Sequence, residues 1–341
     1  MSQHNPFAGR RTRVLGMEDV RKLLDIDAGI EIQRQAFLDA ARGATTTAPN
    51  SWLRLPGERR GWLKLLAGYD GAMSALGTKV LARFPNNPPG ANLGSILMLF
   101  DEDNGFPLAI MEGAYVTAVR TGAGAALATE AMARPDAASV GLIGTGVVAW
   151  YSLLAMKRVR KGLAQLSVCS RSKHRREAFA ARARDELSMQ ATAVAHVEEA
   201  VSGVDIVITA TNSPRPVLLA GHVEKGQLIN AMGIKTEIEP EAVARCLVIG
   251  DAKEETLADG KFSYALSAGV VTPADLGPDL GEVLNGASIA TSRLAIMFDS
   301  SGVAIQDVTC ARWVWERADE LGVGALVDLG MDGSLCAPPR K

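Results

Sequence analysis

The pattern of apolar and polar positions in the first third of the chain predicts one helix followed by a sheet. Apolar residues recur at helical spacing from Met17, and the pattern ends at Gly43, a residue type that commonly terminates helices. The stretch from residue 43 to residue 100, rich in Gly, Pro and Asn, is the least regular part of the chain. Short apolar segments here and just beyond predict strands of a mixed or antiparallel sheet. The segments are GWLKLLAGY (61–69), LGTKVLARF (76–84), GSILMLFD (94–101) and PLAIMEG (107–113).

A helical pattern returns at Tyr115, and from Ala137 short apolar runs alternate with helical stretches. Continuous apolar strands joined by helices indicate a parallel sheet covered on both faces, because each right-handed crossover places a helix on one side. A further strand, a Ser-Ser-Gly turn at 300–302 and a long helix complete the pattern. The sequence therefore predicts a doubly wound α/β domain. Its strands are SVGLIG (139–144), QLSVCS (165–170), ATAVA (191–195), DIVITAT (205–211), QLINAMG (227–233) and CLVIGD (246–251).

A glycine-rich loop follows the first of these strands and matches the pattern G-x-G-x-x-A. Gly144 permits a tight turn, Gly146 lets the backbone approach a pyrophosphate, and Ala149 allows close packing of helix and strand. The pyrophosphate would lie at the helix N-terminus, where free N–H groups and the helix dipole favour an anion. A glycine turn without a ligand is the alternative. The candidate cofactor residues of the loop are Gly144, Thr145, Gly146, Val147 and Val148.

The second strand of this domain bears on which dinucleotide is bound. In NAD-binding domains an acidic residue near its end holds the ribose 2′-hydroxyl, but here the strand is followed by Ser170, Arg171, Ser172 and Lys173. Guanidinium and hydroxyl groups pair well with phosphate oxygens, so these residues predict NADP(H). Two alternatives remain open: the basic run is the solvated start of a helix, or Arg171 stacks on the adenine and tolerates NAD(H).

Composition and charge exclude several classes of protein. The 341 residues, 48% of them hydrophobic, suggest two domains of an ordinary globular protein. A net charge of −2 creates no field that attracts nucleic acid or an anionic membrane. No apolar run reaches the roughly 20 residues of a membrane span, and the N-terminus lacks the apolar region of a secretion signal. Four widely spaced cysteines form no zinc or disulfide pattern, so we expect a cytoplasmic protein without a metal site.

The segment RTGAGAALATEAMARPDAASVGLIGTG (120–146) resembles the ornithine cyclodeaminase and μ-crystallin family. Five further segments share the resemblance, which extends from about Met17 to Gly330: LGTKVLARFPNN, GSILMLFDEDNGFPLAIMEG, DIVITATNSPRPVL, GEVLNG and MFDSSGVAIQDV. It implies a Rossmann-type nucleotide domain inserted into a mixed α+β substrate and dimerisation domain. The expected parts are residues 1–127 for the first piece of the substrate domain, 128–305 for the nucleotide domain and 306–341 for a returning C-terminal helix. A homodimer is also expected.

The resemblance also assigns roles to individual residues. Lys79 matches the catalytic lysine of the family, and Arg54 and Arg120 match arginines that bind the substrate carboxylate, with Arg120 close to the chemistry. An α-imino acid needs a bidentate anion clamp, which arginine provides, and an acid near its nitrogen, which a lysine can supply. Ordinary surface contacts are the alternative reading. Further cofactor contacts are implied for Thr121, Thr209, Ala210, Thr211, Met232, Gly233 and Ser301.

The sequence departs from the cyclodeaminases after the strand at 227–233. These enzymes carry an acid/base aspartate in the following loop, whereas Gly233 here leads almost directly to IKTE. Lys235 and Glu237 are candidate substrate-binding residues. Two alternatives stay open: they match the Lys and Glu that stand further along the cyclodeaminase motif, or the shorter loop places Glu237 near the pocket as a substitute for the missing carboxylate. Asp299 and Asp307 stand near the start of the last long helix, where an acidic residue is more often a cap than a catalyst.

The missing aspartate and the expected NADP(H) together favour reduction. The leading hypothesis is an NADPH-dependent reductase of an α-imino acid or cyclic ketimine, with a small amino or imino acid as its partner. Three alternatives stay open: an amino-acid or opine-type dehydrogenase working in the oxidising direction, an enzyme similar to ornithine cyclodeaminase, and an NADP-binding protein without catalytic activity.

Overall fold

The computed structural model describes residues 6–57, 60–88, 91–290 and 292–331. Its contacts divide the chain into two compact units. The first unit comprises residues 1–25, 43–117 and 304–341, and the second comprises residues 26–42 and 118–303. The second unit is thus inserted into the first, as expected. Its boundaries differ from the predicted ones, and residues 26–42 group with the nucleotide domain.

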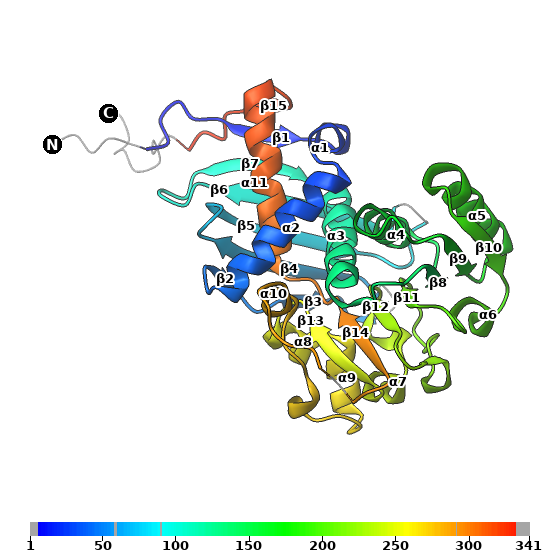
Figure 1. Ribbon diagram of the computed structural model, residues 1–341. Coiled ribbons are helices and arrows are strands. Elements are labelled where there is room, and N and C mark those ends of the chain that lie inside the picture. Colours follow the sequence, from blue (N-terminus) through cyan, green and yellow to red (C-terminus); the bar gives the residue numbers. More distant parts are fainter. Residues whose placement is uncertain (1–5, 58–59, 89–90, 291, 332–341) are drawn as a thin grey trace, which may run out of the picture. The chain divides into compact units, whose positions relative to one another are not determined.

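The first unit is built on an eight-stranded sheet with the strand order β15-β1-β7-β6-β5-β4-β2, in which β3 also pairs with β4 (Figure 1). All pairs are antiparallel except the parallel pair of β1 and β7, which confirms the predicted mixed sheet. The sequence pattern missed the short strands β1, β2, β3 and β15. The strands are β1 (Thr12–Leu15), β2 (Thr45–Thr47), β3 (Ser51–Arg54), β4 (Trp62–Asp70), β5 (Ala75–Arg83), β6 (Leu93–Phe100), β7 (Pro107–Glu112) and β15 (Ala325–Val327).

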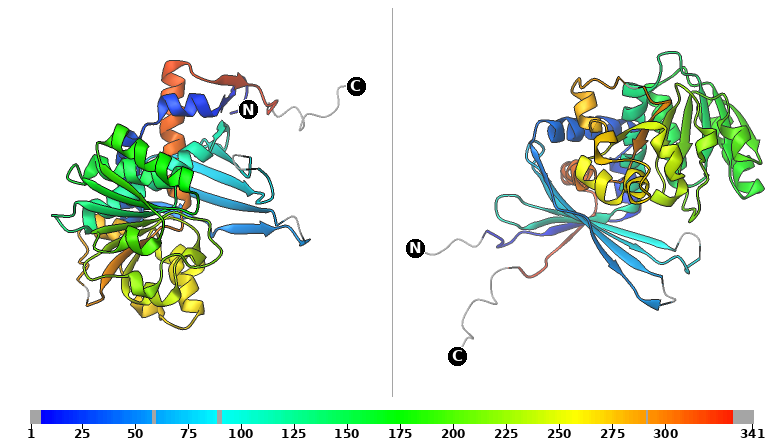
Figure 2. Two further views of the ribbon diagram at one scale, coloured as in Figure 1. Left: turned by 90° about the vertical axis from the view of Figure 1, so that its right-hand side faces the viewer. Right: turned by 90° about the horizontal axis from the view of Figure 1, so that it is seen from below.

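Helix α11 (Ala304–Leu321) packs on one face of this sheet, and two glycines make room for it (Figure 2). A Cβ atom on Gly68 would lie 2.8 Å from the Cβ of Ala304, and one on Gly77 would lie 3.1 Å from a methyl group of Val308. A larger residue at Gly68 would push the helix away from the sheet, and one at Gly77 would in addition lie 2.5 Å from the Met98 carbonyl oxygen of β6. The face of the sheet that packs against α11 therefore forms the core of the first unit.

The predicted single helix from Met17 to Gly43 is wrong in one respect, because the chain leaves the helical conformation at Leu24 and Asp25. Helix α1 (Met17–Leu23) ends there and helix α2 (Ile26–Ala41) begins. The backbone carbonyl of Leu23 accepts a hydrogen bond from Trp313 Nε1 (3.2 Å), and that of Leu24 accepts one from the Tyr115 hydroxyl (3.0 Å). These side-chain donors take the place of helical N–H groups, which local periodicity does not reveal.

The second unit contains a seven-stranded parallel sheet with the order β10-β9-β8-β11-β12-β14-β13. The strand order reverses between β8 and β11, as in Rossmann-type domains, and confirms the predicted fold class. On the far side of β12, the late strand β14 lies between β12 and β13. Glycines allow close helix packing: a Cβ atom on Gly29 of α2 would lie 2.4 Å from Val119 of α3. This contact explains why α2 belongs to the second unit. The strands are β8 (Ser139–Ile143), β9 (Gln165–Cys169), β10 (Gln190–Val194), β11 (Ile206–Thr209), β12 (Leu228–Ala231), β13 (Cys246–Gly250) and β14 (Ala295–Asp299).

The connections between these strands are mostly helical, as predicted. The α-helices are α3 (Ala114–Met132), which runs from the first unit into the second, α4 (Val147–Val159), α5 (Lys173–Leu187), α6 (Val197–Val201), α7 (Pro240–Ala244), α8 (Lys253–Asp259), α9 (Lys261–Ser267) and α10 (Leu280–Leu284). Within the described residues, the 3₁₀ helices of the second unit are η2 (Ala220–His222), η3 (Lys235–Glu237) and η4 (Pro273–Asp275). Among the described residues, no helix combines the length and the apolar character needed to cross a membrane.

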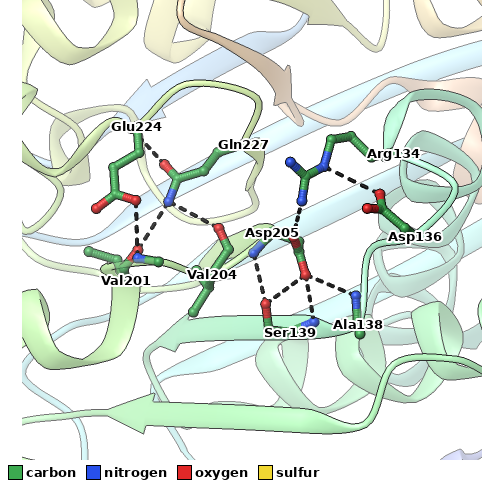
Figure 3. Close-up of polar contacts among 10 residues, drawn as sticks. Arg134, Asp136, Ala138, Ser139, Val201, Val204, Asp205, Glu224 and Gln227 are labelled. Carbon is green, nitrogen blue, oxygen red and sulfur yellow. Dashed lines mark hydrogen bonds and ion pairs between the residues drawn. The ribbon is translucent and has the colours of Figure 1, made fainter.

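A polar cluster fixes the amino ends of the central strands (Figure 3). The Asp205 carboxylate accepts hydrogen bonds from the backbone N–H groups of Ala138 (2.9 Å) and Ser139 (3.0 Å) and pairs with Arg134. The Gln227 side-chain amide donates to the carbonyls of Val201 and Val204. These contacts tie together the segments that enter β8, β11 and β12, so the carboxyl ends of the strands are left for a ligand.

Candidate functional site

A cavity of about 580 Å³ lies at the carboxyl ends of β8, β9 and β11. In open parallel sheets ligands bind at such ends, at the point where the strand order reverses. The cavity brings together eight residues predicted to bind a cofactor: Gly144, Thr145, Gly146, Ser170, Arg171, Ser172, Ala210 and Thr211. The remaining lining residues are Ile143, Cys169, Arg175, Val197, Asn212, Ser213 and Val217.

The two glycines of the loop serve different purposes. Gly144 has a positive φ of 111°, and a Cβ atom there would lie 2.4 Å from the Ala210 carbonyl oxygen, so glycine is required for the fold. Gly146 is the N-cap of α4, and a Cβ atom there would meet nothing within 4 Å. The open space in front of Gly146 belongs to the cavity. The first turn of α4 receives no hydrogen bond from its N-cap side chain, so its N–H groups suit a pyrophosphate.

One end of the cavity is basic. Arg171 and Arg175 both line it, and no acidic residue is among the described residues of the lining. Ser172 caps α5 by accepting a hydrogen bond from the Arg175 backbone N–H (3.3 Å), which places Arg175 in the first turn of that helix. Sequence reasoning missed Arg175, although it lies three residues after the cap. The predicted residue Lys173 lies outside the lining, 3.8 Å from Glu177.

Glu237 joins the two loops that follow β11 and β12. Its fully buried carboxylate accepts hydrogen bonds from Thr209 Oγ1 (2.7 Å), from Thr211 N and Oγ1 (2.7 and 2.8 Å), and from Gly233 N (2.8 Å). Burial raises the pKa of this carboxyl group, while a nearby lysine charge and the threonine hydrogen bonds oppose the rise. These contacts define a positioning residue that orders three predicted cofactor positions. Direct contact of Glu237 with the substrate stays a prediction.

Lys79 is a buried residue of the first unit, with 1% of its surface exposed. Its Nζ lies 2.6 Å from Asp307 Oδ2, and it donates a hydrogen bond to Thr117 Oγ1 (3.4 Å). The Asp307 carboxylate is also fully buried, so the two charges face each other away from water. The alternative of an ordinary surface contact is therefore wrong for Lys79. Asp307 was expected to be a helix cap, but it forms an ion pair with Lys79 of β5 instead. Because the two residues are far apart in the sequence, no local pattern reveals this ion pair.

Arg120 lies in a second group of buried charges, in the second unit. Gly302 has a positive φ of 81°, which favours glycine, and a Cβ atom there would lie 3.0 Å from an Arg120 nitrogen, so the guanidinium passes close to the 300–302 turn. The Gly302 N–H donates a 2.5 Å hydrogen bond to Asp251. Lys261 donates to the carbonyls of Ala231 (2.7 Å) and Ser300 (3.0 Å). The turn at 300–302, which carries the predicted cofactor residue Ser301, is thus held by buried polar contacts.

The Asp251 carboxyl group makes folding stability depend on pH. Burial raises its pKa to about 6, with a further rise from Asp299 and opposing effects from Gly302 N–H and Arg120. Because this value lies above the ordinary 3.8, Asp251 favours folding most below about pH 4, and that contribution is lost as the pH rises through 6. Asp251→Asn keeps an acceptor for Gly302 and should raise the unfolding free energy at pH 7.5 by up to about 3 kcal/mol.

Urea unfolding at pH 4.5 and pH 7.5 checks this expectation. The wild type should lose more stability between the two values than Asp251→Asn does, and the exposed control Asp136→Asn should behave like the wild type. An equal pH dependence for wild type and Asp251→Asn would show that this carboxyl group titrates normally.

The other predicted site residues stay predictions. Arg54 is an exposed residue of β3 whose guanidinium lies 4.7 Å from the centre of the Trp52 ring. Lys235 Nζ lies 3.1 Å from Asp259 Oδ1. The predicted cofactor residues that do not line the cavity are Thr121, Val147, Val148, Lys173, Thr209, Met232, Gly233 and Ser301. Cys169, Cys246 and Cys310 are buried free thiols, and Cys336 lies outside the described residues.

The parallel sheet, glycine loop and basic cavity define a Rossmann-type nucleotide-binding unit. The chain belongs to the ornithine cyclodeaminase/mu-crystallin family, whose model matches residues 10–322. This match confirms the family that the sequence motifs resemble.

Three relatives illustrate the similarity. The Delta(1)-pyrroline-2-carboxylate reductase of Bacillus cereus is 30% identical, covering 92% of this chain and 99% of the relative. The structure of Thermococcus litoralis Delta(1)-pyrroline-2-carboxylate reductase in complex with NADH and L-proline is 29% identical, with a TM-score of 0.87, and covers 92% of this chain and 99% of that one. An archaeal alanine dehydrogenase dimer with bound NAD is also 29% identical, with a TM-score of 0.87, covering 94% and 99%.

Proposed function

We propose that the protein is an NADPH-dependent reductase of α-imino acids, including cyclic ketimines. The observation that carries this proposal is the buried ion pair of Lys79 and Asp307. A buried ion pair is a poor means of stabilising a fold, because desolvation offsets the attraction between the charges, whereas perturbed charged groups are common at catalytic sites. Among the relatives, the Delta(1)-pyrroline-2-carboxylate reductases are named for the reduction of a cyclic α-imino acid.

In the proposed reaction, Lys79 and the arginines have separate tasks. A dihydronicotinamide, when bound, supplies the hydride that adds to the carbon of the C=N bond. Lys79 gives a proton from its ammonium group to the nitrogen, so the imine becomes an amine, and the lysine regains a proton from water. Asp307 lies next to the ammonium group and balances its charge. Arg120 and Arg54 are proposed to bind the substrate carboxylate, for which a planar guanidinium group is well suited.

Two alternatives are less favoured by the same residues. The Glu237 carboxylate is surrounded by protein donors, so it is a poor replacement for the aspartate that ornithine cyclodeamination uses. A binding protein without turnover has no need of the buried lysine and aspartate.

Oxidation of an amino acid keeps the same residues, and the similarity to an alanine dehydrogenase keeps that direction as the second candidate. One assay distinguishes these functions. It measures the rate of NADPH oxidation, from the loss of nicotinamide absorbance, in the presence of imines formed from 2-oxo acids and amines.

The choice of NADPH rests on the basic end of the cavity. Arg171 and Arg175, with the hydroxyl groups of Ser170 and Ser172, form a set of donors that fits a 2′-phosphate. Arg171→Ala should weaken NADPH binding by about 10- to 100-fold, because a hydrogen bond to a charged group contributes about 1.5–3 kcal/mol. NADH binding should change little.

Fluorescence titrations of NADPH and NADH measure both affinities. The exposed control Lys225→Ala removes the same charge outside the cavity and should leave both unchanged. If the wild type binds the two cofactors equally and Arg171→Ala weakens both alike, the preference for NADPH is wrong.

We further propose that the protein forms a homodimer through the sheet face opposite α11. Leu65, Val80 and Ile96 lie in register across β4, β5 and β6, and Leu65 and Ile96 are 41% and 51% exposed. A row of aliphatic side chains on a sheet favours burial against a second apolar surface. Ile96→Asp should shift the mass measured by light scattering from dimer to monomer, whereas Leu321→Asp, on an exposed helix end, should not. A monomeric wild type would refute the proposal.

A further inference from the structure

Lys261 is a buried lysine of the second unit that the proposed reaction does not use. It is the first residue of α9 and has 1% of its surface exposed. Its ammonium group donates hydrogen bonds to the carbonyl oxygens of Ala231 (2.7 Å) and Ser300 (3.0 Å) and lies 3.5 Å from Asp299 Oδ1. These three oxygens match the three donors of an ammonium group, so the lysine joins three separate points of the second unit.

The first turn of α9 holds this lysine in place. The Asp299 carboxylate accepts a hydrogen bond from the Phe262 backbone N–H (2.9 Å), and a Cβ atom on Gly260 would lie 2.4 Å from the same carboxylate. Phe262 is fully buried in the core. Helix α9 therefore begins directly against the end of β14, and the Lys261 side chain extends from there to the end of β12.

The two carbonyl groups belong to peptide bonds that lead into the loops after β12 and β14. Ala231 is the last residue of β12, and Ser300 follows the last residue of β14. Because a peptide unit is planar, fixing the Ala231 carbonyl also fixes the N–H direction of Met232. In the same way, fixing the Ser300 carbonyl fixes the N–H direction of Ser301. Lys261 thus helps to orient two predicted cofactor residues.

Ser301 carries a hydroxyl group that suits a ligand. Its Oγ atom is buried, yet it has no hydrogen-bond partner among the described residues. A buried hydroxyl group without a partner costs free energy, and a hydrogen bond to a bound molecule removes that cost. The loop after β14 therefore has an unused polar atom for a cofactor.

The strand order indicates which half of a dinucleotide these loops would meet. A Rossmann-type sheet binds the two halves of a dinucleotide on either side of the point where its strand order reverses. The glycine loop after β8 is the expected pyrophosphate site, and the basic residues after β9 are the expected site of the adenosine phosphate. The nicotinamide half would then extend the other way, over β11, β12 and β14.

We propose that Lys261 is a positioning residue for the nicotinamide half of the cofactor, because it holds the loops after β12 and β14 in the orientation that binds the nicotinamide ring. This inference rests on the proposed function, since it takes a nicotinamide dinucleotide as the cofactor. Lys261 takes no part in hydride or proton transfer. Its expected effect is on the affinity for one half of the cofactor only.

A matched pair of ligands tests this proposal. In 2′-phospho-ADP-ribose a hydroxyl group replaces the dihydronicotinamide ring of NADPH, and calorimetric titration measures the affinity for both. The variant Lys261→Met/Asp299→Asn removes both charges together, so no buried charge is left unpaired, and the asparagine keeps an acceptor for the Phe262 N–H. This variant should raise the Kd of NADPH by about 5- to 10-fold, the effect of one misaligned hydrogen bond. The Kd of 2′-phospho-ADP-ribose should stay unchanged.

The control Lys253→Met removes the same charge from the exposed first residue of α8 and should change neither affinity. A melting curve without ligand shows that each variant is folded. NADH and ADP-ribose form a second matched pair, which lacks the 2′-phosphate and should give the same pattern. An equal loss for both members of a pair, or an unchanged affinity for the nicotinamide dinucleotide, would overturn the proposal.

Hydrogen exchange on the wild type gives a test that needs no variant. NADPH should protect the backbone N–H groups of residues 231–233 and 300–302 more than 2′-phospho-ADP-ribose does, and equal protection would overturn the proposal. A selective loss of NADPH affinity without turnover of any imine would retain the role of Lys261 and refute the reductase function. Turnover of imines, with an equal loss for both ligands in the Lys261 variant, would do the reverse.

Discussion

Replacing Lys79 by alanine is expected to reduce kcat by about 100- to 10,000-fold while NADPH binding stays unchanged. A positioned acid or base contributes about that factor to a reaction, and Lys79 is the proposed proton donor to the imine nitrogen. All the described residues that line the cavity of the glycine loop belong to the second unit, so we expect the nucleotide affinity not to depend on Lys79. Steady-state rates and NADPH fluorescence titrations on the same preparation measure both quantities.

A fold control is needed because Lys79→Ala leaves the Asp307 carboxylate buried without its ion pair. Loss of one partner of a buried pair destabilises a protein by about 3–5 kcal/mol, whereas replacing both partners by apolar residues is often neutral. The double variant Lys79→Met/Asp307→Leu should therefore melt close to the wild type and remain inactive. Activity near the wild-type level in this variant would show that the pair is structural only.

Gly146→Val is expected to abolish most cofactor binding without unfolding the protein. A Cβ atom at this position meets nothing within 4 Å, so the side chain fits the protein but occupies the space where a pyrophosphate approaches the α4 N-terminus. Loss of at least one charge-assisted hydrogen bond predicts about a 10- to 100-fold rise in the NADPH dissociation constant, or more with steric exclusion. Fluorescence titration and a melting curve give the two readouts.

Two other glycines provide matched comparisons. In Gly144→Ala, the added Cβ atom would clash with the Ala210 carbonyl oxygen, and alanine would have to adopt a positive φ. This variant should therefore have a lower melting temperature, unlike Gly146→Val. Gly162→Ala meets nothing within 4 Å and lies outside the cavity lining, so it should change neither property. Normal NADPH affinity in Gly146→Val would mean that the loop does not hold the pyrophosphate.

The features that the sequence revealed are those with a local signal. The strands of the parallel sheet are continuous apolar runs, and the motif residues Gly144 and Gly146 occupy the positions that the motif implies. The apolar runs also show where β8, β9 and β11 end. Because the cavity lies at these ends, the sequence predicts about half of the residues that line it. The break at Leu24 was not, because the groups that replace helical hydrogen bonds come from Tyr115 and Trp313.

The contacts of the charged groups were harder to predict because the paired residues are far apart in the sequence. Asp307 is paired with Lys79, and Asp251 with Gly302, across many residues. Nothing in the neighbourhood of either aspartate shows that it is buried. Arg175 is an intermediate case, since its spacing of three residues from Ser172 places it in the first turn of α5 and gives a local signal.

Transfer of label from the cofactor to the product tests the central claim most directly. The protein would be incubated with NADPH carrying deuterium on the transferring face of nicotinamide C4, together with the imine that it turns over fastest. If the protein is an imine reductase, mass spectrometry should find a single deuterium on the α-carbon of the amino acid product. Lys79→Ala should form this labelled product about 100- to 10,000-fold more slowly. Consumption of the imine with an unlabelled product, from NADPH deuterated on either face, would contradict hydride transfer to the C=N carbon and refute the proposed function.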